Sequence, residues 1–225
     1  MNLKDFDKLL FPNGKPKATY SNMVGIDHLI KTCNSYSKDI KYASSVAAKD
    51  TSFDAKILPY NEIIEYQICY FIINLMRIKE YNKHLEFIYN KSNIASSWMT
   101  TDLCNQYLKK ADFKEYKPYF LKFIKSKGTY QKRFGYVLAL KFARDEETSI
   151  FFLNHIIKDD AYYVMMAEAW LIAEIGIYHF DLVCDFLRNS NHSLILKKKA
   201  ISKMIDSYRI SDDNKTILKE IRNML

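Results

Sequence analysis

From residue 60 onward the sequence repeats one pattern: an apolar-striped segment, a short connection and a second such segment. The first segments begin near Tyr60, Ile94, Thr129, Asp160 and Ser193, at spacings of 34, 35, 31 and 33 residues. The second segments cover residues 79–90, 113–126, 146–158, 179–189 and 211–223. Apolar residues in each segment recur at the three- to four-residue spacing of an α-helix. Because one helix pair cannot bury its apolar face alone, such repeats must stack.

We therefore predict an all-α fold, in which HEAT-like helical repeats stack into a curved α-solenoid, an α-α superhelix. Only five Gly and four Pro occur among 225 residues, so few points interrupt helices. We expect a single domain over 1–225, with an N-terminal helix and basic loop at 1–20 and regular helix pairs over 60–225. A further helix is predicted over 21–38, and one or two short helices over 39–58. The inner face predicted for the helix over 21–38 is Met23, Ile26, Leu29, Ile30 and Cys33.

The cysteines and the apolar runs indicate an intracellular protein. Cys33, Cys69, Cys104 and Cys184 are far apart, with no CxxC pair, and predict reduced core thiols rather than disulfides or a metal site. The N-terminal MNLKDFDKLLF carries charges inside its first apolar run, so no signal peptide is predicted. The longest apolar run, Ile68 to Ile73, is too short to span a bilayer. No glycine-rich phosphate loop occurs, which argues against nucleotide hydrolysis.

Basic residues are concentrated in two stretches of a chain whose net charge is +8. Between Lys109 and Arg133, nine basic residues accompany two acidic ones, which gives this stretch a charge of +7. The second stretch contains Lys197, Lys198, Lys199, Lys203 and Arg209, opposed only by Asp206. Aromatic residues lie between the basic residues of the first stretch. The pattern fits a polyanion, most commonly nucleic acid, although a lysine-rich solvated surface looks the same.

The stretch SWMTTD at 97–102 contains the most unusual pair of side chains. In a helix, Trp98 and Asp102 are four residues apart and share one face. The predicted apolar face of this helix is Met99, Leu103, Cys104, Tyr107 and Leu108. An indole and a carboxylate are thus presented together where a surface helix normally carries Lys or Glu. The structural alternative is that Trp98 covers a loop and that Asp102 pairs with a neighbouring Lys.

Six motifs follow one another in the order of a known family. They are YNEII at 60–64, SWxxxD at 97–102, RFG at 133–135, YYVxMAxAW at 162–170, KAIxK at 199–203 and YRIS at 208–211. Together they resemble the DNA alkylation repair family of HEAT-like DNA glycosylases. The resemblance covers about residues 20–222 and is most specific over 160–211.

The resemblance implies helical repeats that wrap duplex DNA and excise N3- and N7-alkylated purines, such as 3-methyladenine and 7-methylguanine. It implies that Asp102 is the catalytic aspartate, that Trp98 and Trp170 flank the sugar of the lesion, and that Arg133 lies beside the site. The partner is then double-stranded DNA with alkylated purines, and we expect no metal, no cofactor and no membrane contact. We also expect a monomer, cytoplasmic and associated with the bacterial nucleoid.

The residue types suit that chemistry independently. A purine alkylated at N3 or N7 is already cationic, so it leaves without a general acid. Positive charge then develops on the deoxyribose, and a fixed carboxylate at Asp102 stabilises it or holds the attacking water. The indole faces of Trp98 and Trp170 carry negative potential and favour a cationic base or sugar. Arg133 suits bidentate contact with a phosphate.

Alternatives remain open for these residues and for the function. Trp170 shares a helical stripe with Tyr163 and Ala167, which is typical of core, and Arg133 suits a buried structural ion pair equally well. The candidate DNA-binding residues are Lys109, Lys110, Lys132, Lys197, Lys198, Lys199, Lys203 and Arg209. A non-catalytic HEAT-like module for damaged or branched DNA, or a solenoid for an acidic protein partner, would carry the same basic blocks.

Overall fold

The computed structural model describes residues 1–14, 25–26, 30–33, 35–108 and 111–225. The described part is all-α, as predicted: helices follow one another along the chain, and the only β-type pairing there is one isolated bridge. No helix in these ranges is long and apolar enough to cross a membrane. The chain forms two compact units, 1–119 and 120–225, and each is described by itself.

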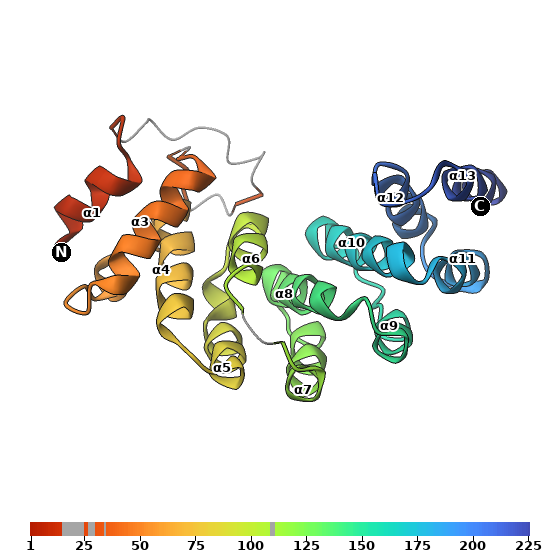
Figure 1. The fold of residues 1–225 in the computed structure, drawn as a ribbon, viewed down its shortest axis with the longest axis horizontal. Coiled ribbons are helices and arrows are strands. Elements are labelled where there is room, and N and C mark those ends of the chain that lie inside the picture. Colours follow the sequence, from red (N-terminus) through yellow and green to blue (C-terminus); the bar gives the residue numbers. More distant parts are fainter. Residues whose placement is uncertain (15–24, 27–29, 34, 109–110) are drawn as a thin grey trace. The chain divides into compact units, whose positions relative to one another are not determined.

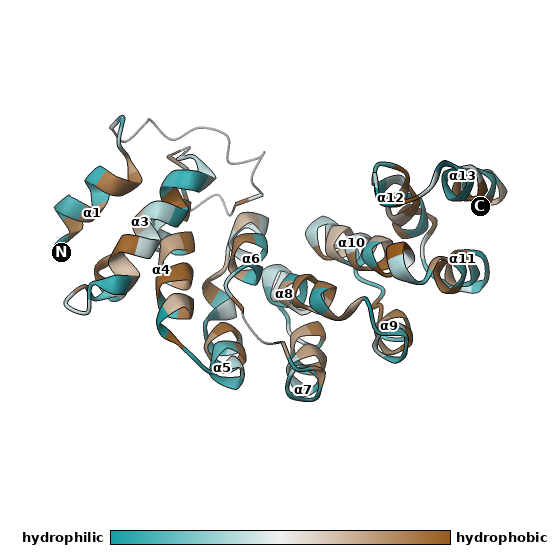
Figure 2. Ribbon diagram, viewed as in Figure 1, coloured by the Kyte–Doolittle hydropathy of each residue, from teal (hydrophilic) through white to brown (hydrophobic). Residues whose placement is uncertain are grey.

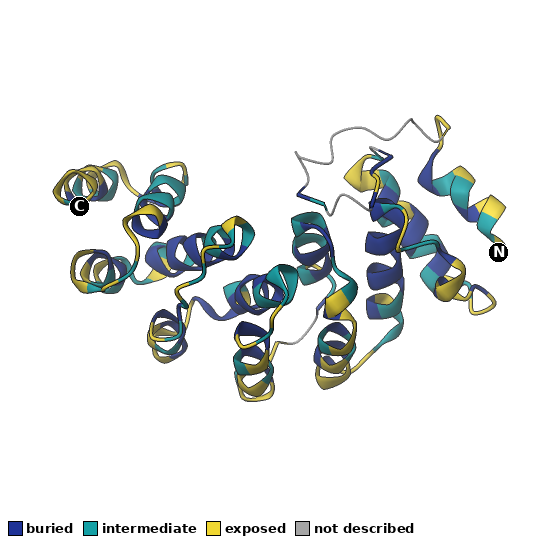
Figure 3. Ribbon diagram, turned by 180° about the vertical axis from the view of Figure 1, so that it is seen from behind, coloured by how far each residue is buried: buried dark blue, intermediate teal, exposed yellow. Residues whose placement is uncertain are grey.

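The first unit is built around one helix that is buried along nearly its whole length. Figure 1 shows the order of the helices along the chain. Its helices are α1 (Leu3–Leu10), α3 (Ser37–Lys49), α4 (Ile64–Arg77), α5 (Tyr81–Lys91), α6 (Trp98–Asn105) and the start of α7 (Phe113–Ile124). Two 3₁₀ turns cover Ala55–Ile57 and Ser92–Ile94. Helix α3 packs against α1 and α4, and α4 packs against α6. Figure 3 shows α4 dark blue along nearly its whole length, because almost every residue from Ile64 to Leu75 is buried.

The second unit contains α8 (Thr129–Ala139), α9 (Glu146–Leu153), α10 (Tyr162–Tyr178), α11 (Phe180–Asn189), α12 (Leu194–Ile205) and α13 (Asp212–Met224). A 3₁₀ turn, Leu140–Phe142, follows α8. Helix α10 packs against α8, α11 and α12, so it forms the centre of this unit. The outermost helix, α13, has hydrophobic and hydrophilic sides (Figure 2), since it buries Leu218 and Ile221 and exposes charged residues between them.

The predicted repeat is confirmed in the described residues. Helices α4, α6, α8, α10 and α12 begin at residues 64, 98, 129, 162 and 194, so their starts recur every 31 to 34 residues. Each is followed by the predicted second helix, α5, α7, α9, α11 or α13. Several helices are shorter than predicted, most of all α6 and α9, which have eight residues each. The short helices predicted over 39–58 correspond to α3 and the first 3₁₀ turn. The curvature of the stack stays a prediction.

The predicted helix over 21–38 is wrong in the part that the structure describes. Lys31 lies in an isolated parallel bridge, in which its N–H donates to Glu62 O and its carbonyl accepts from Ile64 N, at 3.0 and 2.8 Å. The buried Glu65 carboxylate accepts hydrogen bonds from Thr32 Oγ1, Cys33 N and Ser35 N. These partners, in α4 and just before it, replace the hydrogen bonds of a helix, which is why the apolar spacing was misleading. Met23 and Leu29 lie outside the described residues.

Candidate functional site

Helix α6 begins at Trp98 because the preceding residue caps it. Ser97 has extended backbone angles, and its Oγ accepts a hydrogen bond from Met99 N at 3.1 Å. Such a serine satisfies one of the free N–H groups of the first helical turn. Trp98 and Asp102 lie one turn apart on this helix, and both are half-buried. The predicted pairing of indole and carboxylate on one helix is confirmed.

The predicted apolar face of α6 is only half correct. Cys104 and Leu108 are buried, whereas Met99, Leu103 and Tyr107 are half-buried. The buried positions in the first turn are instead Thr100 and Thr101. Their hydroxyls have hydrogen-bond partners, so two polar side chains are tolerated where the sequence pattern favoured apolar ones.

The amide group of Gln67 in α4 holds the segment that leads into α6. Its Nε2 donates to Ile94 O at 2.7 Å. Its Oε1 accepts from Ser96 N at 3.1 Å and from Thr100 Oγ1 at 2.9 Å. Gln67 is fully buried, so these contacts form away from water, where an unpaired polar group would be costly. The start of α6, with Trp98, is thereby fixed to the core of the first unit.

A threonine hydroxyl lies directly beside the carboxylate of Asp102. Thr101 Oγ1 is 2.9 Å from Asp102 Oδ1 and 2.8 Å from the carbonyl oxygen of Trp98, and its hydrogen can be donated to either. Thr101 is buried, so its position does not depend on solvent. The hydroxyl therefore offers the carboxylate a hydrogen-bond donor, of the kind that electrostatic preorganisation uses.

In the second unit, Arg133 is a buried residue of α8. Its side chain contacts backbone at the start of the next long helix: Nη1 donates to Tyr163 O at 2.8 Å. Only 5% of Arg133 is exposed. The guanidinium thus joins α8 to the first turn of α10 through a backbone carbonyl. The buried ion pair and the phosphate contact both stay predictions.

Trp170 of α10 lies half-buried at the edge of a cavity, not in the core. The cavity has a volume of about 260 Å³ and is lined by Trp170, Ala173, Glu174, Ile177, Lys203, Asp206, Ser207 and Arg209. Lys203 Nζ is 5.9 Å from the centroid of the indole ring, within cation–π range. Lys203 therefore lies over the indole to which the resemblance assigns the sugar of the lesion, and that role of Trp170 stays a prediction.

Arg209 forms a bidentate ion pair with Glu174 at the same cavity. Arg209 Nη1 and Nη2 donate to Glu174 Oε1 and Oε2 at 2.8 and 2.6 Å, in the fork geometry of arginine–carboxylate pairs. The Glu174 hydrogen bonds raise the pKa of Arg209, which keeps the guanidinium charged. Arg209 was expected from the sequence, whereas Glu174 was not, because a glutamate within an apolar helix carries no local signal of its partner 35 residues away.

The other candidate DNA-binding lysines differ in their surroundings. Lys198 and Lys199 are half-buried residues of α12. Lys197 is buried and donates to Ser190 O at 2.6 Å. Lys132 pairs with Asp159. Lys109 and Lys110 lie outside the described residues.

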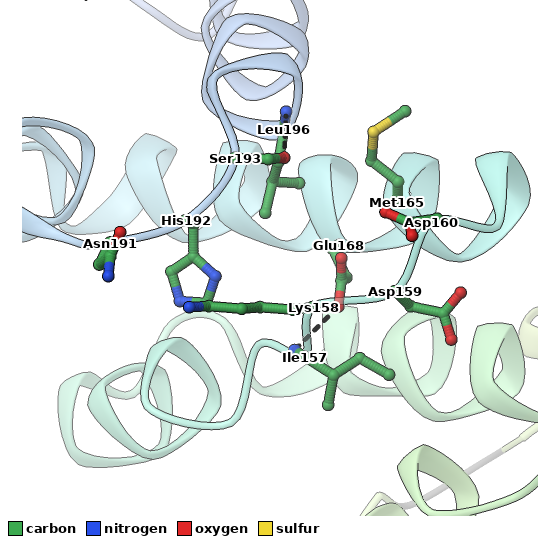
Figure 4. Close-up of a pocket in the computed structure, with 10 residues that line it drawn as sticks. All are labelled: Ile157, Lys158, Asp159, Asp160, Met165, Glu168, Asn191, His192, Ser193 and Leu196. Atoms are coloured by element: carbon green, nitrogen blue, oxygen red, sulfur yellow. Dashed lines mark hydrogen bonds between the residues drawn. The ribbon is translucent and has the colours of Figure 1, made fainter.

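A second cavity, of about 330 Å³, lies on another side of α10 (Figure 4). Glu168 lines it, is almost fully buried and accepts a hydrogen bond from Ile157 N at 3.0 Å. Burial raises the pKa of Glu168 to about 8, against the hydrogen bonds from Ile157 and Tyr136 that lower it. His192 lines the same cavity, and burial together with the charges of Lys158 and Lys197 lowers its pKa. The sequence signal was present: Glu168 is the one charged residue of YYVMMAEAWLIA.

A comparison with known protein families shows which family the chain is related to. Residues 29–204 match the family described as DNA alkylation repair enzyme. The chain belongs to this family. No curated protein and no solved structure matches it.

The matched range contains all four residues that the resemblance singled out. Trp98 and Asp102 lie in the first unit of this DNA alkylation repair family member, and Arg133 and Trp170 lie in the second. Glu174 and Lys203 also lie within the match, whereas Arg209 lies beyond its end. The DNA alkylation repair family thus accounts for the coarse function, the repair of alkylated DNA.

Proposed function

We propose that the protein is a DNA glycosylase that excises N3- and N7-alkylated purines from duplex DNA. Asp102 is the catalytic residue in this proposal. Its carboxylate stabilises positive charge on the deoxyribose as the N-glycosidic bond breaks, and water then completes the hydrolysis to an abasic site. The protein acts as a cytoplasmic monomer and needs no metal or cofactor for this step.

The observation that carries the proposal is the construction of α6. A carboxylate and an indole lie one turn apart on a helix whose start is fixed by Gln67 and Ser97. The Thr101 hydroxyl, with its Oγ1 at 2.9 Å from Asp102 Oδ1, offers the carboxylate a hydrogen bond. A surface ion pair would need neither restraint, whereas electrostatic catalysis needs both a fixed charge and a fixed helix.

The aromatic and basic residues complete the proposed binding of DNA. Trp98 and Trp170 offer indole faces to the cationic base or the sugar. The proposed phosphate contacts are Arg133, Lys198, Lys199, Lys203 and Arg209, with Lys109, Lys110, Lys132 and Lys197 adding positive charge.

The test is release of free base from duplex DNA methylated with an SN2 methylating agent. Wild-type protein should release 3-methyladenine, 7-methylguanine or both, separated and quantified by chromatography, above the rate of spontaneous depurination. Unmethylated duplex of the same sequence is the control and should release nothing.

Two other outcomes would favour the alternatives. Salt-sensitive duplex binding without base release would support a non-catalytic module for damaged or branched DNA. Neither binding nor release would support a solenoid for an acidic protein partner, and would contradict the proposal.

A further inference from the structure

We propose that Glu174 is a positioning residue for DNA binding: it holds the Arg209 guanidinium at the cavity beside Trp170, where Arg209 contacts a backbone phosphate. The inference rests on the proposed function only in taking duplex DNA as the partner. It adds a residue of negative charge to a surface whose other proposed contacts are positive.

The ion pair between the two residues fixes the guanidinium in space. Both Nη atoms of Arg209 donate to the two carboxylate oxygens, at 2.8 and 2.6 Å. The Glu174 side chain is only 15% exposed, whereas the Arg209 side chain is 39% exposed. The carboxylate is therefore shielded beneath an arginine that still reaches solvent. A guanidinium has five N–H donors, so this end-on pairing leaves others for a second anion.

The backbone that carries Arg209 is held as well. Arg209 N donates to Ser207 Oγ at 3.2 Å, and the next residue, Ile210, is buried. Ser211 then caps α13 through a hydrogen bond from Asn214 N to its Oγ. The α12–α13 connection thus presents Arg209 on an anchored turn, and Glu174 of α10 fixes the remaining side-chain freedom.

A second cation lines the same cavity. Lys203 lies on α12 with its Nζ 5.9 Å from the Trp170 ring centroid. Lys203, Arg209 and the Ser207 hydroxyl together offer two charged donors and one neutral donor to one space of about 260 Å³, which the carboxylates of Glu174 and Asp206 also line. That donor set fits a phosphate group better than a base edge, because phosphate accepts from several directions and carries charge.

The negative charge of Glu174 allows two explanations of its role in DNA binding to be told apart. If Glu174 acted only through its charge, it would repel phosphate and weaken DNA binding. If it positions Arg209, the gain from an ordered guanidinium exceeds that repulsion. Asp206 lines the same cavity, is exposed and forms no ion pair among the described residues, so it serves as the matched control.

The experiment measures the affinity of the full chain for unmodified duplex DNA as a function of salt concentration, for wild type, Glu174→Gln, Asp206→Asn and Arg209→Gln. We expect Glu174→Gln to weaken binding about fivefold, although it removes a negative charge. We expect Asp206→Asn to tighten binding slightly. The slope of log K against log salt is negative, and its magnitude should fall by about 0.9 for Arg209→Gln and by most of that for Glu174→Gln.

Two further variants separate positioning from folding. Arg209→Lys keeps the charge but cannot form the fork, so it should weaken binding nearly as much as Glu174→Gln. In the Arg209→Gln background, Glu174→Gln should cause no further loss. A merely structural ion pair would lower the melting temperature of Glu174→Gln yet leave the salt slope of the folded protein unchanged, and that result would overturn the inference.

The failure of the inference and that of the proposed function are distinguishable. Tighter binding by Glu174→Gln, in parallel with Asp206→Asn, would refute positioning while leaving the glycosylase proposal intact. Absence of salt-sensitive duplex binding by wild type would refute both. Base release by wild type tests the glycosylase proposal alone.

Discussion

Gln67 Oε1 accepts a hydrogen bond from Thr100 Oγ1 at 2.9 Å, which joins the buried centre of α4 to the first turn of α6. The same oxygen accepts from Ser96 N, and the amide nitrogen donates to Ile94 O. Ser96 Oγ donates to Gln67 Oε1 as well, so one side chain binds four groups of the segment that precedes the candidate catalytic residue. The placement of Asp102 depends on a polar group inside the core, not on the surface of α6.

Replacing this amide should destabilise the fold. Gln67→Leu keeps the approximate size but leaves Ser96 N and Ile94 O buried without their partners, which costs about 2–4 kcal/mol. Denaturant unfolding measures the free energy directly. Gln106→Ala is the control, because Gln106 is exposed at the end of α6, and it should change the unfolding free energy by less than about 0.5 kcal/mol. Equal effects of the two substitutions would contradict the structural role of Gln67.

The two helical glycines of the second unit should respond differently to alanine. A Cβ on Gly135 would lie 3.0 Å from Phe123 Cβ, an atom that cannot move without its backbone. A Cβ on Gly176 would lie 2.4 Å from Met204 Cε, the end of a flexible side chain. We expect Gly135→Ala to lower the unfolding free energy by about 1–2 kcal/mol despite the better helix propensity of alanine.

Gly176→Ala is the matched variant in the same experiment. Because Met204 can rotate away, the propensity gain should offset the repacking cost, and stability should stay within about 0.5 kcal/mol of wild type. If Gly176→Ala lost more unfolding free energy than Gly135→Ala, the close contact of α8 with Phe123 would not be what makes alanine unfavourable at Gly135.

Glu168 should make the stability of the protein depend on pH. Burial raises its pKa from an ordinary value of 4.5 to about 8, so the folded protein binds this proton more tightly than the unfolded chain. Its contribution is therefore complete below about pH 4.5 and is lost as pH rises through 8. Glu168→Gln should melt at a temperature close to wild type at pH 5 and at a higher one at pH 9.

Thermal melts from pH 5 to pH 9 measure this difference. Glu220→Gln, at an exposed position of α13, should show a difference from wild type that does not change with pH. If Glu168→Gln behaves like Glu220→Gln, the carboxyl is not protonated in the folded protein.

The sequence alone was sufficient to predict most of the helices but not the polar contacts that they make. Helix starts followed from apolar periodicity, which is a local signal. The structure adds local caps at several of these starts, among them Ser97, Ser193 and Ser211. The helix predicted over 21–38 failed because Glu65, more than 30 residues away along the chain, supplies the hydrogen bonds of residues 32–33. No local pattern contains that partner.

The same distinction holds at the candidate site. Trp98 and Asp102 were predictable because a four-residue spacing places them on one helical face. Gln67 and Glu174 were not, since each matters only through residues about 30 positions away. A polar residue inside an apolar run was the available signal, but it does not name its partner.

The most direct test of the catalytic assignment compares Asp102→Asn with wild type in single-turnover excision from duplex DNA carrying one 7-methylguanine, together with affinity for the same duplex. The account predicts that Asp102→Asn lowers the excision rate by about 10²- to 10³-fold, while affinity is unchanged or higher because an anion near phosphates is removed. Excision by Asp102→Asn at the wild-type rate would contradict the account.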